Sequence, residues 1–544
     1  MLKPIDHGAD GDLMVNGRTA RLALHACLLA CTVGWSFVAS AAEFYISPRG
    51  NDARGCTNQT SDVCATFTRC IKVMAPGDTC YALAGTYITS GLKGWNMYGA
   101  GGTSVARKTF RGMPNQTVII KPASYANSTQ ESTINIGDSA MDFVTFSDLT
   151  IYGRFKAAEQ ADDCADNVTL ERIVFKCPGA IGVGNTVSLM TASSGADIDR
   201  DGTVDTWTPR DGWIIRDNVF TIDDTCPDYA PFMPDGPDFV HLYSVSGTIV
   251  ENNDFRIADA TKSSLSPRVR FGLWFKGRAQ HVRARLNYCE GDIGGCFIIN
   301  TGRCPDGFQE TCETILRPYS EGDNQAYQNV SFRSGTIGWD SSNYAAGDAV
   351  YNNTIYRPRY DGLNAAPRPG EGRSRAENSV FNNIIVGDAR DSLGNYYGYL
   401  RWVSNTDSDG ICTQSFIDHN LYFPVSTSKR ANFSDNGHGS SSLSDWQAYL
   451  TAHCTNSEVR ETHSRAVDPL FVDAPSGDLR LHADSPARSG GRGGPWPTAL
   501  GAYVTGTEVV GCTFSELCHA RGYRLPPEPE TPARVLGVVR TDAR

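Results

Sequence analysis

A basic segment within an acidic chain holds the most concentrated set of reactive side chains. The segment 268–285 contains no carboxylate, and its basic residues are Arg268, Arg270, Lys276, Arg278, His281, Arg283 and Arg285. Guanidinium and ammonium groups bind carboxylate or sulfate groups, and arginine can do so through two parallel hydrogen bonds. The segment also contains Trp274, whose ring can stack on a sugar. These residue types together favour contact with an anionic polysaccharide.

Side chains alternate between the two faces of a β-strand, and this alternation sorts the segment. Apolar residues at alternating positions are expected to point into the protein: Phe271, Leu273, Phe275, Val282, Ala284 and Leu286. The residues between them are expected to point outward: Arg270, Trp274, Lys276, His281, Arg283 and Arg285. The pattern predicts a cationic outer face with an aromatic platform; a solvated face with incidental charges is the alternative.

Such a face suits β-elimination from a uronic-acid polymer. The reaction must neutralise the carboxylate, remove the proton beside it and release the leaving oxygen. Lys276 or His281 is the predicted base, and Arg270 or Arg283 the predicted neutralising cation. A lysine base needs a lowered pKa, which neighbouring cations can provide. The residues expected to bind the polymer are Trp274, Arg268 and Arg285.

Hydrolysis of a glycosidic bond is the second hypothesis, and it requires two carboxyl groups across the bond. The candidate pairs are Glu290 with Asp292, expected two apart on one strand face, and Asp223 with Asp224. The tripeptide 437–439 is Gly-His-Gly, as in polygalacturonases, but the other motifs of those enzymes are absent, so we interpret it as chance. A non-catalytic carbohydrate-binding protein is the third hypothesis, because the same basic face would serve it.

An aspartate-rich stretch predicts a calcium site. Residues 197–205 read Asp-Ile-Asp-Arg-Asp-Gly-Thr-Val-Asp, and alternating carboxylates in a tight loop supply the six to eight oxygens that Ca²⁺ requires. The expected ligands are Asp197, Asp199, Asp201, Asp205 and the carbonyl oxygen of Thr203. The stretch resembles the short calcium loops of dockerins and integrin propeller blades. It departs from an EF-hand at its twelfth position, where Thr208 replaces the bidentate Glu. A polar turn is the alternative, and a structural ion is favoured over a catalytic one.

A returning phrase indicates the elements that position these side chains. It consists of an apolar residue, two polar residues, Asn, any residue and an apolar residue, at 215–220, 250–255, 350–355, 380–385 and 417–422. The copies lie about 24 to 45 residues apart, an interval typical of solenoids. Each copy reads as a short strand, with no long helical pattern between copies. One strand per turn, stacked in parallel, gives a β-helix in which each Asn takes a tight bend and bonds the Asn one coil away.

The two ends of the repeat region carry further phrases. They are 43–52, 75–79, 84–87, 442–446, 468–472, 478–481, 484–487 and 500–503. Together these phrases resemble the opening and closing phrases of secreted right-handed parallel β-helix proteins of the pectate-lyase-like superfamily. The resemblance covers about residues 43–505. It implies an all-β fold with an N-terminal cap, short helices near 67–74 and 443–451, and long inserted loops. It leaves the activity open, because this architecture has many functions. Lyases of that superfamily use Lys, Arg or His, some with calcium, which fits the basic segment.

Composition sets limits on function and organisation. The net charge of -11 argues against general nucleic-acid binding. A solenoid grows along one axis, so the 544 residues are compatible with one domain. The content of 40% hydrophobic residues and 54 Gly suits short strands and turns. The expected organisation is a leader at 1–42, a β-helix at 43–505, and a disulfide turn with a Pro-rich tail at 506–544. We expect a monomer.

The N-terminus predicts export. Arg18 and Arg21 precede an apolar run, and Ala39-Ser40-Ala41 matches a signal-peptidase site. No second long apolar run follows, so we expect no membrane span and a secreted or periplasmic protein.

Cysteine content agrees with export, because 15 of the 17 Cys lie beyond the leader and exported proteins keep disulfides. Sequence neighbours suggest pairs Cys56–Cys64, Cys70–Cys80, Cys164–Cys177, Cys289–Cys296, Cys304–Cys312, Cys412–Cys454 and Cys512–Cys518, with Cys226 left over. Zinc is the alternative, but no CxxC pair occurs.

Overall fold

The structure is a computed structural model that describes part of the chain. The described residues are 41–90, 94–123, 132–136, 141–156, 165–177, 185–190, 210–222, 226, 237–243, 245–257, 269–277, 279–301, 322–339, 347–359, 361–364, 378–387, 389–390, 396–397, 400–402, 411–423, 433–435 and 438–519.

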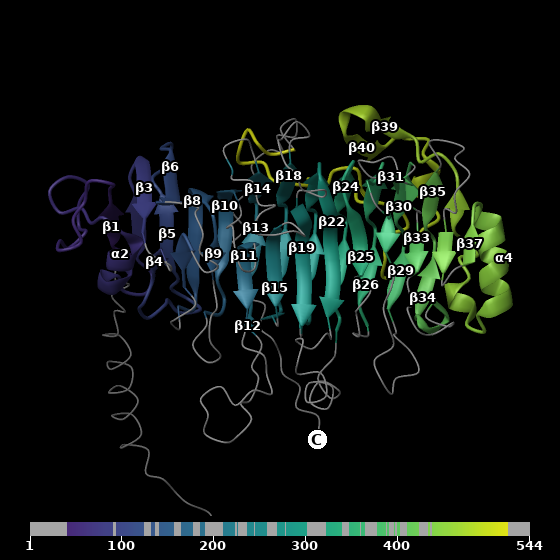
Figure 1. Ribbon diagram of the computed structural model, residues 1–544, viewed down its shortest axis with the longest axis horizontal. Helices are drawn as coiled ribbons and strands as arrows, with labels where there is room; N and C mark the ends of the chain where they lie inside the picture. Colours follow the sequence, from purple (N-terminus) through teal and green to yellow (C-terminus); the bar gives the residue numbers. More distant parts are fainter. Residues whose placement is uncertain are drawn as a thin grey trace, which may run out of the picture. The chain divides into compact units, whose positions relative to one another are not determined.

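Nearly all strands belong to two large sheets (Figure 1). The twelve-stranded sheet contains, in spatial order, β4 (Trp95–Asn96), β7 (Ile134–Asn135), β9 (Phe155–Lys156), β11 (Asn185–Met190), β15 (Asp238–Tyr243), β19 (Val269–Gly277), β22 (Ile293–Thr301), β25 (Thr336–Trp339), β28 (Leu363–Asn364), β33 (Leu400–Trp402), β36 (Phe433–Asp435) and β37 (His438–Ser440). Its strands pair in parallel, except that β36 and β37 form an antiparallel end.

The 22-stranded sheet consists of two parallel ladders joined along a sharp bend. The first ladder contains β1 (Glu43–Ile46), β2 (Thr79–Ala82), β5 (Lys108–Gly112), β8 (Val144–Tyr152), β10 (Thr169–Lys176), β13 (Ile214–Arg216), β17 (Ile249–Glu251), β20 (Arg283–Arg285), β23 (Gln325–Tyr327), β26 (Ala349–Tyr351), β29 (Ser379–Phe381) and β34 (Phe416–Asp418). The second ladder contains β3 (Gly85–Thr89), β6 (Val118–Pro122), β14 (Val219–Ile222), β18 (Asp254–Ile257), β21 (Tyr288–Glu290), β24 (Val330–Phe332), β27 (Thr354–Tyr356), β30 (Ile384–Val386), β35 (Leu421–Phe423) and β38 (Arg465–Ala466), and β8 and β10 run through both.

Each coil visits the three strand rows in turn, which makes the protein a right-handed parallel β-helix. From β19 the chain enters β20, bends into β21 and returns to the twelve-stranded sheet as β22. Strand β19 pairs in parallel with β22, β20 with β23 and β21 with β24, so each coil adds one strand to each row. Parallel crossovers of this kind are right-handed in nearly all proteins. The fold predicted from the sequence is confirmed.

The bend between the two ladders holds the predicted Asn stack. The Asn253 side-chain nitrogen donates to the Asn287 side-chain oxygen at 2.9 Å, and Asn287 donates to Asn329 in the same way at 2.9 Å. The stack continues through Asn353, Asn383 and Asn420, and begins at Asn218. All these side chains are fully buried, so the stack satisfies polar groups inside the core.

One detail of the bend differs from the prediction. The residue before each Asn, and not the Asn, takes the left-handed conformation, as in Asn252 (φ 53°) and Leu286 (φ 57°). Leu286 was expected inside the coils, but it packs against a second apolar cluster outside them, because the left-handed residue turns the chain at this point. A shorter polar stack, Asn324, Asp348 and Asn378, lies before the first ladder and was not expected.

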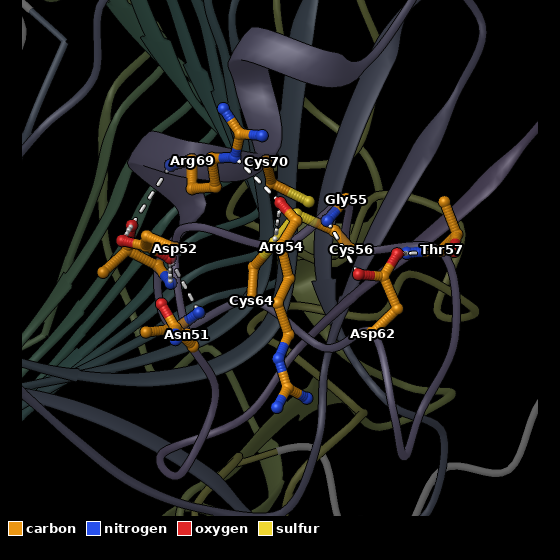
Figure 2. Close-up of a disulfide and its surroundings, with 12 residues drawn as sticks. Asn51, Asp52, Arg54, Gly55, Cys56, Thr57, Asp62, Cys64, Arg69 and Cys70 are labelled. Carbon is orange, nitrogen blue, oxygen red and sulfur yellow. Dashed lines mark hydrogen bonds between the residues drawn. A yellow bond between two sulfur atoms is a disulfide. The ribbon is translucent and has the colours of Figure 1, made fainter.

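The N-terminal end is closed by α2 (Phe67–Val73) and two disulfides, Cys56–Cys64 and Cys70–Cys80. Figure 2 shows Cys56 and Cys64 with the polar residues around them. Thr66 caps this helix, and Asp62 accepts hydrogen bonds from the backbone of Gly55 and Thr57. At the other end, α4 (Leu443–His453) begins after the capping residue Ser442. Both helices lie within two residues of their predicted bounds.

The segment 467–519, which we call the strap, packs on the outside of the coils. Its carbonyl oxygens at Pro497, Ala499 and Val509 accept hydrogen bonds from Asn382 at 3.0 Å, Asn352 at 2.8 Å and Asn252 at 2.7 Å, respectively. The strap therefore runs back toward earlier coils as its residue number rises, and it covers an apolar layer on the second ladder. Residues 506–519 of the predicted tail belong to the strap, and 520–544 lie outside the described residues.

Six disulfides occur among the described residues. Five of them were predicted. The sixth corrects the prediction: Cys177 bonds to Cys226, 49 residues away, and not to Cys164, because the next coil brings Cys226 beside it. Cys304 and Cys312 lie outside the described residues. This disulfide content indicates a protein that folds in an oxidising compartment. Within the described residues, no helix has the length and apolar character needed to span a bilayer.

Candidate functional site

The basic segment 268–285 is divided between two faces of the β-helix. Arg270, Trp274 and Lys276 lie in β19 of the twelve-stranded sheet, whereas Arg283 and Arg285 lie in β20 of the first ladder. His281 takes the left-handed turn between the two strands (φ 54°). The single outer face expected from alternation is therefore wrong, because the coil turns a corner within the segment.

On the β19 face, the aromatic platform is covered. Trp274 is 5% exposed, stacks on His241 with ring centroids 4.6 Å apart, and carries the Arg270 guanidinium 4.6 Å above its ring. Arg270 donates two hydrogen bonds to the buried Asp238, at 3.0 and 2.7 Å. His241 was missed in the sequence, although alternation within 238–243 places it one coil before Trp274, with which it pairs in register.

Three further predictions concern this face. Phe271 was expected inside, but it is half-buried with the Arg270 guanidinium 5.1 Å from its ring. It lies outside the main core cluster, whereas Leu273 and Phe275 belong to that cluster, as predicted. Lys276 lies opposite Tyr243 and Asn300 in the parallel strand register. The structure describes its backbone but not its side chain. Arg268 lies outside the described residues.

On the first ladder, one carboxylate joins two of the predicted catalytic residues. Asp323 Oδ2 lies 3.2 Å from His281 Nδ1 and 2.6 Å from Arg283 Nη2, and the backbone carbonyl of Asp323 also accepts from Arg283. His281 and Asp323 are about two-fifths exposed, at 40% and 41% of their side chains. We call His281, Arg283, Arg285, Asp323 and Tyr327 the first-ladder site.

The electrostatics of Asp323 follow from these contacts. Partial burial alone would raise its pKa, but hydrogen bonds from Arg283, Gln325 and His281, with the positive charge of Arg283, hold the pKa below its usual value. Asp323 is therefore an ionised acceptor at neutral pH. If His281 Nδ1 donates to it, the lone pair of that imidazole is on Nε2, as required of a general base.

A second pair continues the site along the same strand row. Arg285 Nε donates to Glu251 at 2.8 Å, and its Nη1 lies 3.4 Å from the Tyr327 hydroxyl. Tyr327 stacks on Tyr351 with centroids 4.8 Å apart, and Tyr351 stacks on Phe381 at 4.9 Å. Half-buried Tyr327 offers an aromatic ring beside the Arg285 guanidinium, which is the combination of ring and cation that Trp274 was expected to provide.

Carboxylates from neighbouring coils lower the positive charge of both faces. Asp238 lies one coil before Arg270, Glu251 one coil before Arg285, and Asp323 beside Arg283. All three partners lie at least 32 residues from their arginine. The segment has no carboxylate of its own, so the sequence overstated its cationic character.

The alternative carboxylate pair does not have the predicted arrangement. Glu290 ends β21 and binds Arg256 at 2.8 Å. Asp292 lies in the turn before β22, 3.8 Å from Arg359, so the two are not alternate residues of one strand. Asp223 and Asp224 lie outside the described residues. His438 of the Gly-His-Gly tripeptide stacks on Tyr449 with ring centroids 3.8 Å apart and contacts Ser440.

The predicted calcium ligands, Asp197, Asp199, Asp201, Thr203 and Asp205, all lie outside the described residues. The calcium site stays a prediction.

Among known proteins, the chain is similar only to solved structures, and only at low sequence identity. No protein-family model matches the chain, and no curated protein does. Among solved structures, pectate lyase Pel9A is 12% identical with a TM-score of 0.44, covering 86% of this chain and 97% of that one. XylC in complex with xylose is 12% identical (TM-score 0.41; 73% and 86%), as is a lacto-N-biosidase from Eubacterium ramulus (TM-score 0.35; 74% and 66%). At these values the likeness concerns the parallel β-helix architecture alone.

Proposed function

We propose that the protein is an exported carbohydrate-active enzyme that cleaves an acidic polysaccharide by β-elimination at the first-ladder site. The observation that carries the proposal is the position of Asp323, which holds a histidine and an arginine together on an accessible strand face. A base and a fixed cation side by side are the two groups that removal of a proton next to a uronate carboxylate requires.

Each residue has a defined part in the proposed reaction. Arg283 and Arg285 pair with the sugar carboxylate, which lowers the cost of forming the carbanion-like transition state. His281 takes the proton from the carbon beside the carboxylate at Nε2, and the C4–O4 bond breaks as the C4–C5 double bond forms. Tyr327, whose hydroxyl lies 3.4 Å from Arg285 Nη1, protonates the leaving oxygen. Lys276 stays an alternative base, with Arg270 as its cation and Trp274 as its platform.

To test this, the protein is incubated with a panel of polyanionic glycans. The absorbance near the unsaturated-uronate band and the formation of reducing ends are measured. A lyase gives both signals, a hydrolase gives reducing ends without the absorbance, and a non-catalytic binder gives neither. Either of the last two outcomes overturns the proposal.

Variants then locate the site on a confirmed substrate. We expect His281→Ala to lower turnover by about 10²- to 10⁴-fold with little change in KM. His438→Ala is the matched control, because His438 is an exposed histidine stacked on a tyrosine at the far end of the coils. Full activity in His281→Ala, with loss in a Lys276→Ala variant, would move the reaction to the β19 face.

The proposal also includes the compartment, the partners, the oligomeric state and a bound ion. Export to the periplasm or beyond fits the six disulfides, and the acidic chain argues against nucleic acid as a partner. We propose a monomer that binds Ca²⁺ in the loop 197–205.

A further inference from the structure

Two groups of metal-binding side chains bring potential ligand atoms within 4.8 Å of one another among the described residues. In the first group, Asp254 lies with Cys512 and Cys518, but those two sulfurs form a disulfide and are not thiolate ligands. The second group contains Asp418, His419 and His463. Imidazole and carboxylate are ligands that Zn²⁺ prefers.

The fold holds the second group together by its backbone. Asp418 ends β34, and His419 takes the left-handed position of the Asn bend (φ 57°), where earlier coils carry polar residues or leucine. His463 lies one coil later, before β38. Asp418 Oδ1 accepts the backbone N–H groups of His419 and His463, each at 2.7 Å. One buried carboxylate thus fixes two histidines from successive coils.

Both imidazole rings are oriented by an acceptor at Nδ1. His419 Nδ1 lies 2.8 Å from the carbonyl oxygen of Gly490, and His463 Nδ1 lies 2.7 Å from Asp418 Oδ2. A carbonyl oxygen can only accept, so Nδ1 of His419 carries the proton and its lone pair is on Nε2. A carboxylate or carbonyl behind Nδ1 is how proteins orient metal-binding histidines. The two rings are parallel within 4° and their centroids lie 4.7 Å apart.

We propose that His419 and His463, oriented by Gly490 and Asp418, form a site for a divalent transition metal such as Zn²⁺. Two nitrogens at zinc distance from one ion must lie about 3.4 Å apart, so the parallel rings, with centroids 4.7 Å apart, must turn out of their stacked arrangement until both Nε2 atoms face the ion. His463 can do this because its side chain is 67% exposed, while Asp418, at 7%, keeps its place. The remaining coordination positions are open to water or to an anionic ligand. This site is separate from the first-ladder site and does not depend on the proposed function.

The test titrates Zn²⁺ into the full-length protein after chelator treatment and return of Ca²⁺, with Co²⁺ as a spectroscopic substitute. We expect one equivalent of Zn²⁺ to be lost in His463→Ala, and the cobalt absorption bands with it. His482→Ala is the matched control: His482 is 59% exposed and lies 3.6 Å from Asp484, but no second imidazole among the described residues is stacked on it. Equal zinc stoichiometry in the wild type and His463→Ala would overturn the site, as would loss of the equivalent in His482→Ala alone.

A second measurement uses the unaltered protein, so it does not depend on the folding of a variant. Zn²⁺ should protect His463 from carbethoxylation, detected by mass spectrometry, and leave His482 reactive. Unchanged reactivity of His463 at saturating Zn²⁺ would contradict the proposal, whatever the activity of the protein on glycans.

Discussion

Single residues in this protein depend on partners from other coils. His281 and Arg283 meet Asp323 from the following coil, and Arg270 meets Asp238 from the preceding one. Such pairs fix side-chain orientation more than they add stability, because partly exposed ion pairs contribute little net free energy. At the first-ladder site, orientation is what a general base needs.

Asp323→Asn tests Asp323 as a positioning residue. The amide cannot stabilise a protonated imidazole as the carboxylate does, so we expect turnover to fall by about 10-fold or more and the acidic limb of the pH–rate profile to move to lower pH. If the pH–rate profile of the variant keeps its position and activity is lowered equally at every pH, Asp323 has only a structural role. Gln325→Ala is the control, since Gln325 contacts the other oxygen of Asp323 at 3.0 Å.

At the scale of the element, the Asn bend makes the coils equivalent. Each buried Asn in the stack before the last, Asn420, donates its side-chain nitrogen to the next Asn and to a backbone carbonyl, as Asn353 does to Asn383 at 3.0 Å and to Ala326 at 2.9 Å. Stacked aromatics reinforce the coils inside, where Phe220 lies 4.9 Å from both Phe175 and Phe255. The regular interior leaves inserted loops free to differ between coils.

Asn353→Ala should destabilise the protein strongly. It removes the acceptor of the Asn329 side chain and backbone, and each buried polar group left unsatisfied costs about 1–3 kcal/mol. Chemical denaturation measures the loss, and Asn51→Ala, at an exposed position of the N-terminal cap, is the control. A loss below about 0.5 kcal/mol would show that water or a shift of the bend replaces the Asn.

The aspartate-rich loop 197–205 gives a second prediction at this scale. Binding to the folded state alone stabilises it by about 2.7 kcal/mol when Ca²⁺ is a hundredfold above its Kd. Removal of Ca²⁺ by dialysis should lower the Tm, return of Ca²⁺ but not of Zn²⁺ should restore it, and Asp201→Ala should abolish the response. Identical melting curves for Asp201→Ala and the wild type at every Ca²⁺ concentration would contradict this site.

At the scale of the whole molecule, buried carboxyl groups set the dependence of stability on pH. Asp254, whose oxygens accept backbone N–H groups of Cys512 and His519 in the strap, has a pKa raised by burial to about 7. Burial also raises the pKa of Glu461, against Tyr422 and Trp446, to about 7. These groups keep their proton when folded and lose it when unfolded, so their stabilising contribution is present at about pH 4 and lost as pH rises to 7.

Other groups oppose this trend only in part. Burial lowers the pKa of His519 to about 4, so its contribution grows as pH rises from about 4 to 6.5. Asp323, with its pKa held below the usual value, loses its contribution when pH falls below about 4. The maximum of stability should therefore lie on the acid side of neutrality. Denaturant midpoints between pH 4 and 8 measure it.

Asp254→Asn and Glu461→Gln, which mimic the protonated groups, should flatten the decline in stability between pH 5 and 7. If stability rises steadily to pH 8 in the wild type, or if neither variant changes the slope, these two carboxyl groups are ionised in the folded protein and the expectation fails.

The strand repeat, the buried Asn of each bend, the two helices described above and five disulfides were predictable from the sequence. The repeat follows from period-two alternation and an Asn at a fixed place, the disulfides from cysteines that are near neighbours in sequence, and the helices from the resemblance of the terminal phrases. The residues that lie one coil apart are known only from the folded protein, as for Cys177 with Cys226, Arg283 with Asp323 and His419 with His463. The physical reason is that coils of a solenoid share the same strand register but differ in loop length, so the distance along the chain between stacked residues changes from coil to coil.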